Sequence, residues 1–131
     1  MLFLSTLPAM AQNDSLLIET GNDMVEGFKA CDLERGAPVS EHTMLIAKCV
    51  HVKGFVEGVA MATEGISAVL RATPSAGLLV EILGVNMPEG VTNGQIDAVV
   101  RHFLDNHPET LHTSASVLVQ RALREAWPNK A

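Results

Sequence analysis

The chain has few aromatic and few charged residues. Its 131 residues include no tyrosine, one tryptophan and four phenylalanines, and only 18% are charged, against roughly 25% in typical soluble domains. The formal net charge is −6, so the chain lacks both the basic field and the stacking rings that nucleic-acid binding uses. Since this charge also disfavours an anionic membrane surface, we expect neither a nucleic-acid nor a membrane partner.

Metal-ligand spacing is also missing. Three of the five histidines are five residues apart, and the other two are nine apart: His102, His107 and His112, and then His42 and His51. Two ligands share one helical face when they are three or four residues apart, so neither spacing fits a metal site. We interpret these histidines as surface or cap-forming residues and expect no bound metal.

Catalytic patterns are equally scarce. Cys49 and His51 lie about 200° apart around a helix, so they form no local thiol-imidazole pair. Glu57 and Glu64 share a helix face, but two solvated carboxylates explain them more simply than an acid/base pair. No serine lies in a nucleophile-elbow context, and no glycine-rich phosphate loop follows a strand. We expect no enzyme activity and no cofactor, which leaves binding as the function.

Apolar residues, by contrast, are abundant. They make up 47% of a chain whose length suits one domain with a single core. With so little polar surface, some apolar area is expected to be buried against a second molecule.

The first residues, MLFLSTLPAMAQ, combine a short apolar run with the small-x-small pattern Ala9-Met10-Ala11. A signal peptidase could cut this pattern, although the basic residues that normally precede the apolar run are missing. The abrupt change to polar residues from Gln12 favours a truncated signal peptide over residues 1–11, followed by a domain over 12–131. The alternative is a hydrophobic disordered start, since the run is too short to span a bilayer.

Cys31 and Cys49 are the only cysteines. An exported chain would reach a compartment where disulfides persist, and we then expect the two to pair. Such a bridge contributes about 3 kcal/mol in the chain-entropy model. The alternative is two unpaired core cysteines.

The periodicity of apolar residues predicts an all-α fold, a small bundle of about four to five helices with one disulfide. Residues 78–85 could form a short helix or an apolar loop, and strand signals are weak throughout. The other expected helices cover residues 22–33, 41–63 with an extension to 72, 92–106 and 114–127.

The expected second helix is apolar on two sides. Val52, Val56 and Ala60 lie on one side, whereas Gly54, Gly58, Ala62 and Gly65 form a stripe of small residues nearly opposite. A helix of this kind is usually buried on both faces. The stripe is either a dimer interface, for which we single out Gly54, Gly58 and Ala62, or the packed interior of a bundle.

Helix starts and a joint can be placed from local patterns. Thr92 and Gln95 form a capping-box pattern, and Ser40 and either Thr113 or Ser114 are expected to cap other helices. His107 ends the third helix, and Pro108 suits the first turn of the next element.

Two further expectations concern the last helices. Asp97, Arg101 and Asp105 are spaced to form opposite-charge pairs on the exposed face of the third helix. In the last helix, the residues expected to point inward are Ala115, Leu118, Ala122 and Ala126.

Three segments together resemble the Rap1a/Tai family. They are GNDMVEGFKACD, KCVHVKGFVEGVAMA and the run from Pro88 to Pro128. The matching residues are Cys31, Cys49, Gly54, Phe55, Gly58, Pro88, Gly90, Val91, Thr92, Gly94, Gln95, His107, Pro108, Leu111, His112, Ala122, Leu123, Ala126, Trp127 and Pro128. Many relatives carry a second cysteine pair where this chain has Met87 and Asn129, so only the Cys31–Cys49 bridge carries over. Without the second bridge, the end of the chain should depend more on the packing of Trp127.

The resemblance implies an all-helical periplasmic protein, often a homodimer, without catalysis. Its best-understood members occlude the active site of a peptidoglycan amidase that a type VI secretion system delivers. The alternative function is a general periplasmic structural or chaperone-like homodimer without a toxin partner.

Partner contacts are expected in the unmatched loop 73–86 or on the joint 106–113. The residues singled out there are Pro74, Leu78, Glu81, Asn86, His107, Glu109 and His112.

Overall fold

The computed structural model of the chain describes residues 16–36 and 38–129, without the side chains of residues 39–41. This part contains five α-helices, three short 3₁₀ segments and no β-strand, which confirms the predicted all-α fold. The elements are α2 (Gly21–Leu33), η2 (Glu34–Gly36), α3 (Val39–Arg71), η3 (Pro74–Ala76), α4 (Gly77–Leu83), α5 (Asn93–Asn106), η4 (Pro108–Thr110) and α6 (Ala115–Ala126). The predicted signal peptide, residues 1–11, lies outside the described residues.

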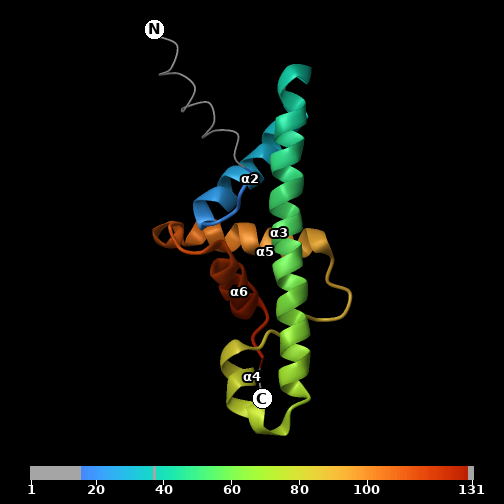
Figure 1. Cartoon of the computed structure of the whole chain (residues 1–131), viewed down its shortest axis with the longest axis vertical. Coiled ribbons are helices and arrows are strands. Elements are labelled where there is room, and N and C mark those ends of the chain that lie inside the picture. Colours follow the sequence, from blue (N-terminus) through green and yellow to red (C-terminus); the bar gives the residue numbers. More distant parts are fainter. Residues whose placement is uncertain (1–15, 37, 130–131) are drawn as a thin grey trace.

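Helix α3 spans 33 residues and runs along the length of the molecule (Figure 1). Helices α2, α5 and α6 pack against one face of it, and α4 folds back beside its C-terminal end. The helix begins at Val39, directly after Pro38. The predicted Ser40 cap was therefore wrong, and Ser40 lies within the first turn. Proline suits this boundary because the first N–H groups of a helix have no partner within it.

One hydrophobic core joins α2, α3, α5 and α6, together with Val85 in the segment after α4. On α3, the predicted inward residues Val52, Val56 and Ala60 are fully buried. They pack against core side chains of the other elements, namely Met24, Phe28, Val85, Ile96, Val100, Phe103, Leu104, Ala115, Leu118, Val119, Ala122 and Leu123. Trp127 is partly buried against the same core. Ala126, which we expected to point inward, is exposed because it lines an open groove and not the core.

The disulfide links α2 to α3. Cys31 and Cys49 are bonded, with their Cα atoms 4.7 Å apart, which confirms the predicted bridge. One helical turn earlier, α2 approaches α3 so closely that a Cβ on Gly27 would lie 2.6 Å from Cβ of Val52. The sequence reading did not identify this contact, because a glycine within a helix is not by itself a packing signal.

The capping box of α5 is present as predicted. The Thr92 hydroxyl accepts from the Gln95 N–H at 3.2 Å, and the Thr92 N–H donates to Gln95 Oε1 at 2.8 Å. Ser114 occupies the N-cap position of α6, but its side chain makes no capping hydrogen bond and lies 3.2 Å from the Ser116 hydroxyl instead. A side-chain cap is therefore present at the start of α5, as predicted, but not at the start of α6.

The expected charge pairs along α5 are wrong. Arg101 instead reaches across to α2, where its two terminal nitrogens lie 3.3 and 2.7 Å from the carboxylate oxygens of Asp32. Its guanidinium also lies 5.2 Å from the centre of the Phe28 ring. The hydrogen bond from Arg101 lowers the pKa of Asp32. Asp97 is left without this partner and is buried rather than exposed.

Candidate partner-binding surface

The C-terminal end of α3 and the short helix α4 form a hairpin at one end of the molecule (Figure 1). Ala76 and Val80 are its buried residues on the α4 side. The return to the core is fixed by polar contacts, because the Val85 N–H donates to the Ser67 hydroxyl at 3.0 Å and Arg71 donates to the Val85 carbonyl at 2.9 Å. Residues 78–85, which the sequence left undecided, are therefore mostly helical and held in a defined position.

Large aliphatic side chains are exposed on both arms of this hairpin. On α4, Leu78 and Ile82 are 69% and 56% exposed, and Leu79 and Leu83 are also exposed. On the α3 arm the exposed large residues are Met61, Ile66 and Val69. We call these seven residues the apolar hairpin surface. Since α4 has only seven residues, burying Val80 leaves most of its aliphatic side chains facing outward.

Part of this surface is hollowed. Ala62, Gly65, Ile66, Val69 and Leu70 of α3 line a shallow depression of about 340 Å³. None of these five residues carries a charge, so the depression offers van der Waals contact and no ion pair. A complementary apolar side chain would gain more contacts here than on a flat helix face.

The predicted contact residues of this region all lie at the surface. Pro74, Leu78, Glu81 and Asn86 are exposed, although the Asn86 N–H donates to the Trp127 carbonyl at 3.0 Å. Their role in partner binding stays a prediction. The sequence reading missed Leu79, Ile82 and Leu83. The run GLLVEIL carried the signal, because it contains more aliphatic residues than one short helix can bury.

The small-residue stripe of α3 is exposed along its length. Gly54, Gly58, Ala62 and Gly65 all lie at the surface, and a Cβ added to any of the three glycines would meet no atom within 4 Å. Helices α2, α5 and α6 pack on the other side, so the alternative of interior packing was wrong for this chain. The dimer interface stays a prediction.

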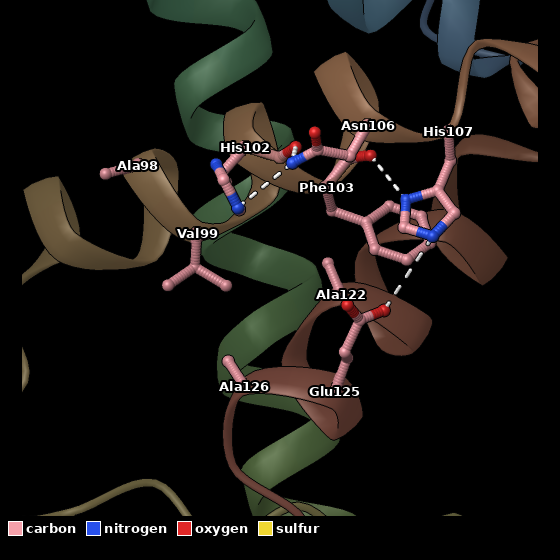
Figure 2. A pocket seen from close by; sticks show the side chains of 9 residues that line it. All are labelled: Ala98, Val99, His102, Phe103, Asn106, His107, Ala122, Glu125 and Ala126. Carbon is pink, nitrogen blue, oxygen red and sulfur yellow. Dashed lines mark hydrogen bonds and ion pairs between the residues drawn. The ribbon is translucent and has the colours of Figure 1, made fainter.

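A groove lies between α5 and α6 beside the predicted joint (Figure 2). Its volume is about 340 Å³. It is lined by Ala98, Val99, His102, Phe103, Asn106, His107, Ala122, Glu125 and Ala126. None of these nine residues offers a hydroxyl, thiol or amine nucleophile. Its lining combines aliphatic and aromatic side chains with the polar groups of His102, Asn106, His107 and Glu125.

His107 is engaged within the chain. Its Nδ1 lies 2.8 Å from the Phe103 carbonyl, and its ring stacks on the Phe103 ring with centroids 4.1 Å apart. On the other side, Nε2 lies 4.0 Å from a Glu125 carboxylate oxygen, as Figure 2 shows. His107 thus ends α5 and links it to α6. Of the other residues predicted at the joint, Glu109 and His112 are exposed and do not line the groove.

Residues 16–36 and 38–129 contain neither a cluster of metal-binding side chains nor a single helix that could span a membrane. No group of three or more His, Cys, Asp or Glu side chains in these ranges could hold a metal ion. No single helix there is long and apolar enough to cross a membrane. His42–Arg71 and Pro74–Leu83 meet that criterion only as a pair bent by 110°.

A family model described as Rap1a immunity proteins matches residues 28–129, which is more than half of the chain. The matched region begins within α2 and includes the hairpin, the groove and both cysteines. No curated protein and no solved structure matches the chain.

Proposed function

Because the chain belongs to the family of Rap1a immunity proteins, we propose that it is a periplasmic, non-catalytic protein that occludes the active site of a secreted peptidoglycan amidase. Membership in an immunity family implies a secreted effector as the protein partner. The amidase, its delivery by a type VI secretion system and the periplasmic location are the finer parts of the proposal. The observation that carries the proposal is the apolar hairpin surface.

The hairpin surface offers exposed aliphatic area that a protein partner can bury. Burying one fully exposed leucine or isoleucine side chain contributes about 1.5–3 kcal/mol. Leu78, Leu79, Ile82 and Leu83 of α4 could supply much of the affinity of a stable complex. Glu81 is exposed among them and provides one charged group for orientation. Small clusters of buried side chains with polar neighbours commonly dominate protein interfaces.

The position of the hairpin also suits occlusion. It forms one end of the molecule, beyond α2 and α5 along the length of α3 (Figure 1). A narrow two-helix projection can enter a concave cleft, whereas a flat face cannot. Blocking a cleft requires no catalytic group from the inhibitor.

The proposal can be tested with purified secreted peptidoglycan amidases, one of which is the expected partner. The purified chain should inhibit cleavage of peptidoglycan and bind the amidase with a dissociation constant of nanomolar order, as inhibitor pairs do. The double variant Leu78→Glu/Ile82→Glu should weaken binding at least about 100-fold, since two charges would have to be buried in the interface.

The matched control is Val117→Glu, which changes an exposed aliphatic residue on α6. It should leave both inhibition and affinity unchanged. Failure of the wild-type chain to inhibit any amidase would contradict the amidase proposal. Equal loss of binding in the control and in the hairpin variant would contradict the assignment of the hairpin.

We further propose that the chain forms a homodimer through the small-residue stripe of α3. Its support is the exposure of Gly54, Gly58 and Ala62 on a helix face without charge, where another helix can approach closely. Gly58→Lys should convert a dimer into a monomer in sedimentation equilibrium, and Lys53→Ala should not. A wild-type chain that sediments as a monomer at high concentration would contradict the dimer.

Exposed apolar area is also the feature that favours the second candidate function, a chaperone-like dimer without a toxin partner. Such a protein would suppress the aggregation of unrelated unfolded clients at micromolar concentration. An amidase inhibitor would bind its one partner tightly and leave client aggregation unchanged.

A further inference from the structure

Asp97 is a buried carboxylate without a hydrogen-bond partner. It lies on α5 and faces α3, with only 6% of its surface exposed. Neither side-chain oxygen is accessible, and neither accepts a hydrogen bond from the described residues. A buried polar atom without a partner is costly, and a buried charge without one is more costly still.

The cations around Asp97 stabilise its charge only in part, since Lys53 and Arg101 lower its pKa less than burial and Glu57 raise it. From α3, Lys53 Nζ lies 3.9 Å from Asp97 Oδ2, which is too far for a hydrogen bond, and Glu57 adds a like charge. From α5 itself, Arg101 is bound to Asp32 of α2. Arg35 of η2 completes the charged groups that line the adjacent hollow. Burial, and then Glu57, raise the pKa of Asp97 to about 6.

We infer that Asp97 is a proton-dependent contact between α5 and α3, which fits as a neutral acid and loosens this packing when it loses its proton. The neutral acid needs no counter-ion and can stay buried. The carboxylate needs a donor, so Lys53 must move in or water must enter between the helices. This property is independent of the proposed function, because Asp97 lies in the α2–α3–α5 core region and not on the hairpin.

The direction of the pH effect follows from the proton count. Folded Asp97 keeps its proton up to a pKa of about 6, whereas an unfolded aspartate loses it near 3.8. Between these values unfolding releases a proton, so stability contributed by Asp97 is present below pH 4 and is lost as the pH rises through 6. Above about pH 7 the loss is complete.

The test compares the unfolding equilibrium of the wild type with that of Asp97→Asn, which keeps the shape but cannot ionise. Between about pH 4.5 and 7.5, the unfolding constant of the wild type should rise about 20-fold relative to that of the variant. Asp105→Asn, an exposed change on the same helix, should leave that ratio constant. A constant ratio for Asp97→Asn would overturn the inference.

A direct titration of the wild type makes the test independent of how well the variant folds. Carbon-13 NMR of the Asp97 carboxyl should show a midpoint well above that of an ordinary aspartate. Glu57→Gln should lower this midpoint and Lys53→Met should raise it, because these changes remove a like charge and an opposite charge respectively. A midpoint at or below about pH 4, the ordinary aspartate range, would overturn the inference.

Discussion

The α5–α6 region and the α3–α4 hairpin differ in how many of their aliphatic residues are buried. In α6, Leu118, Val119 and Leu123 are fully buried, and Val117 is the exposed large aliphatic residue of that helix. In α4, Val80 is buried, but Leu78, Leu79, Ile82 and Leu83 are all exposed. The first region completes its own core, whereas the second leaves its apolar side chains available to another molecule.

This difference distinguishes residues that build the fold from residues that are available to a partner. The residues that resemble the Rap1a/Tai family lie mostly at caps, turns and buried positions, such as Thr92, His107 and Leu123. The exposed aliphatic residues of α4 lie between the matched segments. The matched motifs thus define how the chain folds, and the hairpin between them is where this family member is expected to select its partner.

The largest effect on stability is expected for a substitution in the buried core, which belongs to the scaffold. Leu118 is fully buried. It packs so closely against α2 that a Cβ added to Gly21 would lie 2.6 Å from Leu118 Cδ1. Leu118→Ala should lower the free energy of unfolding by about 2–5 kcal/mol, because it creates a cavity in the core. Urea denaturation measures the loss. Leu78→Ala is the matched control, and an equal loss there would show that the hairpin is also part of the core.

Removing the disulfide should have the next largest effect. Cys31→Ala/Cys49→Ala should destabilise the chain by about 3 kcal/mol, because a bridge restrains the unfolded chain. Thermal unfolding under non-reducing conditions provides the measurement. The same double variant should retain its affinity for the amidase where it is folded, since the bridge lies between α2 and α3 and away from α4. Loss of binding by the folded variant would place the partner surface near the bridge.

The cap of α5 gives a smaller effect. Thr92→Ala removes the hydroxyl that accepts from the Gln95 N–H, and should cost about 1 kcal/mol of folding stability. Chemical denaturation of this variant measures the loss. Ser114→Ala is the control and should cost less, since Ser114 makes no capping hydrogen bond. A loss for Ser114→Ala as large as that for Thr92→Ala would contradict the assignment of the two caps.

The smallest effect is expected on the hairpin itself. Leu79→Ser should change the free energy of unfolding by no more than about 0.5 kcal/mol, as exposed substitutions usually do. It should nevertheless weaken amidase binding, which calorimetry can measure. Destabilisation by several kcal/mol would mean that Leu79 supports the fold and is not reserved for a partner.

Much of the scaffold could be predicted from the sequence, because helix signals are local. The apolar spacing that predicts the helix over residues 22–33 and the Thr92–Gln95 pair each depend on residues within a few positions of one another. The Cys31–Cys49 bridge followed from the small number of cysteines and the signal-like start. These features need no knowledge of the tertiary arrangement.

The surface could not be predicted to the same extent, because it depends on which faces remain uncovered. The sequence could not decide whether the stripe of Gly54, Gly58 and Ala62 would be packed inside. Arg101 was expected to pair along its own helix, but Asp32, remote in sequence, takes that contact and leaves Asp97 buried without it. Such outcomes require the positions of helices that the local pattern does not specify.

The central claim, that the hairpin and not the α5–α6 region meets the effector, is tested most directly by hydrogen–deuterium exchange of the complex with the amidase that the chain inhibits. Peptides that cover residues 74–83 should exchange more slowly in the complex than in the free chain, and peptides that cover 98–126 should not change. Protection confined to 98–126, with 74–83 unaffected, would contradict the account.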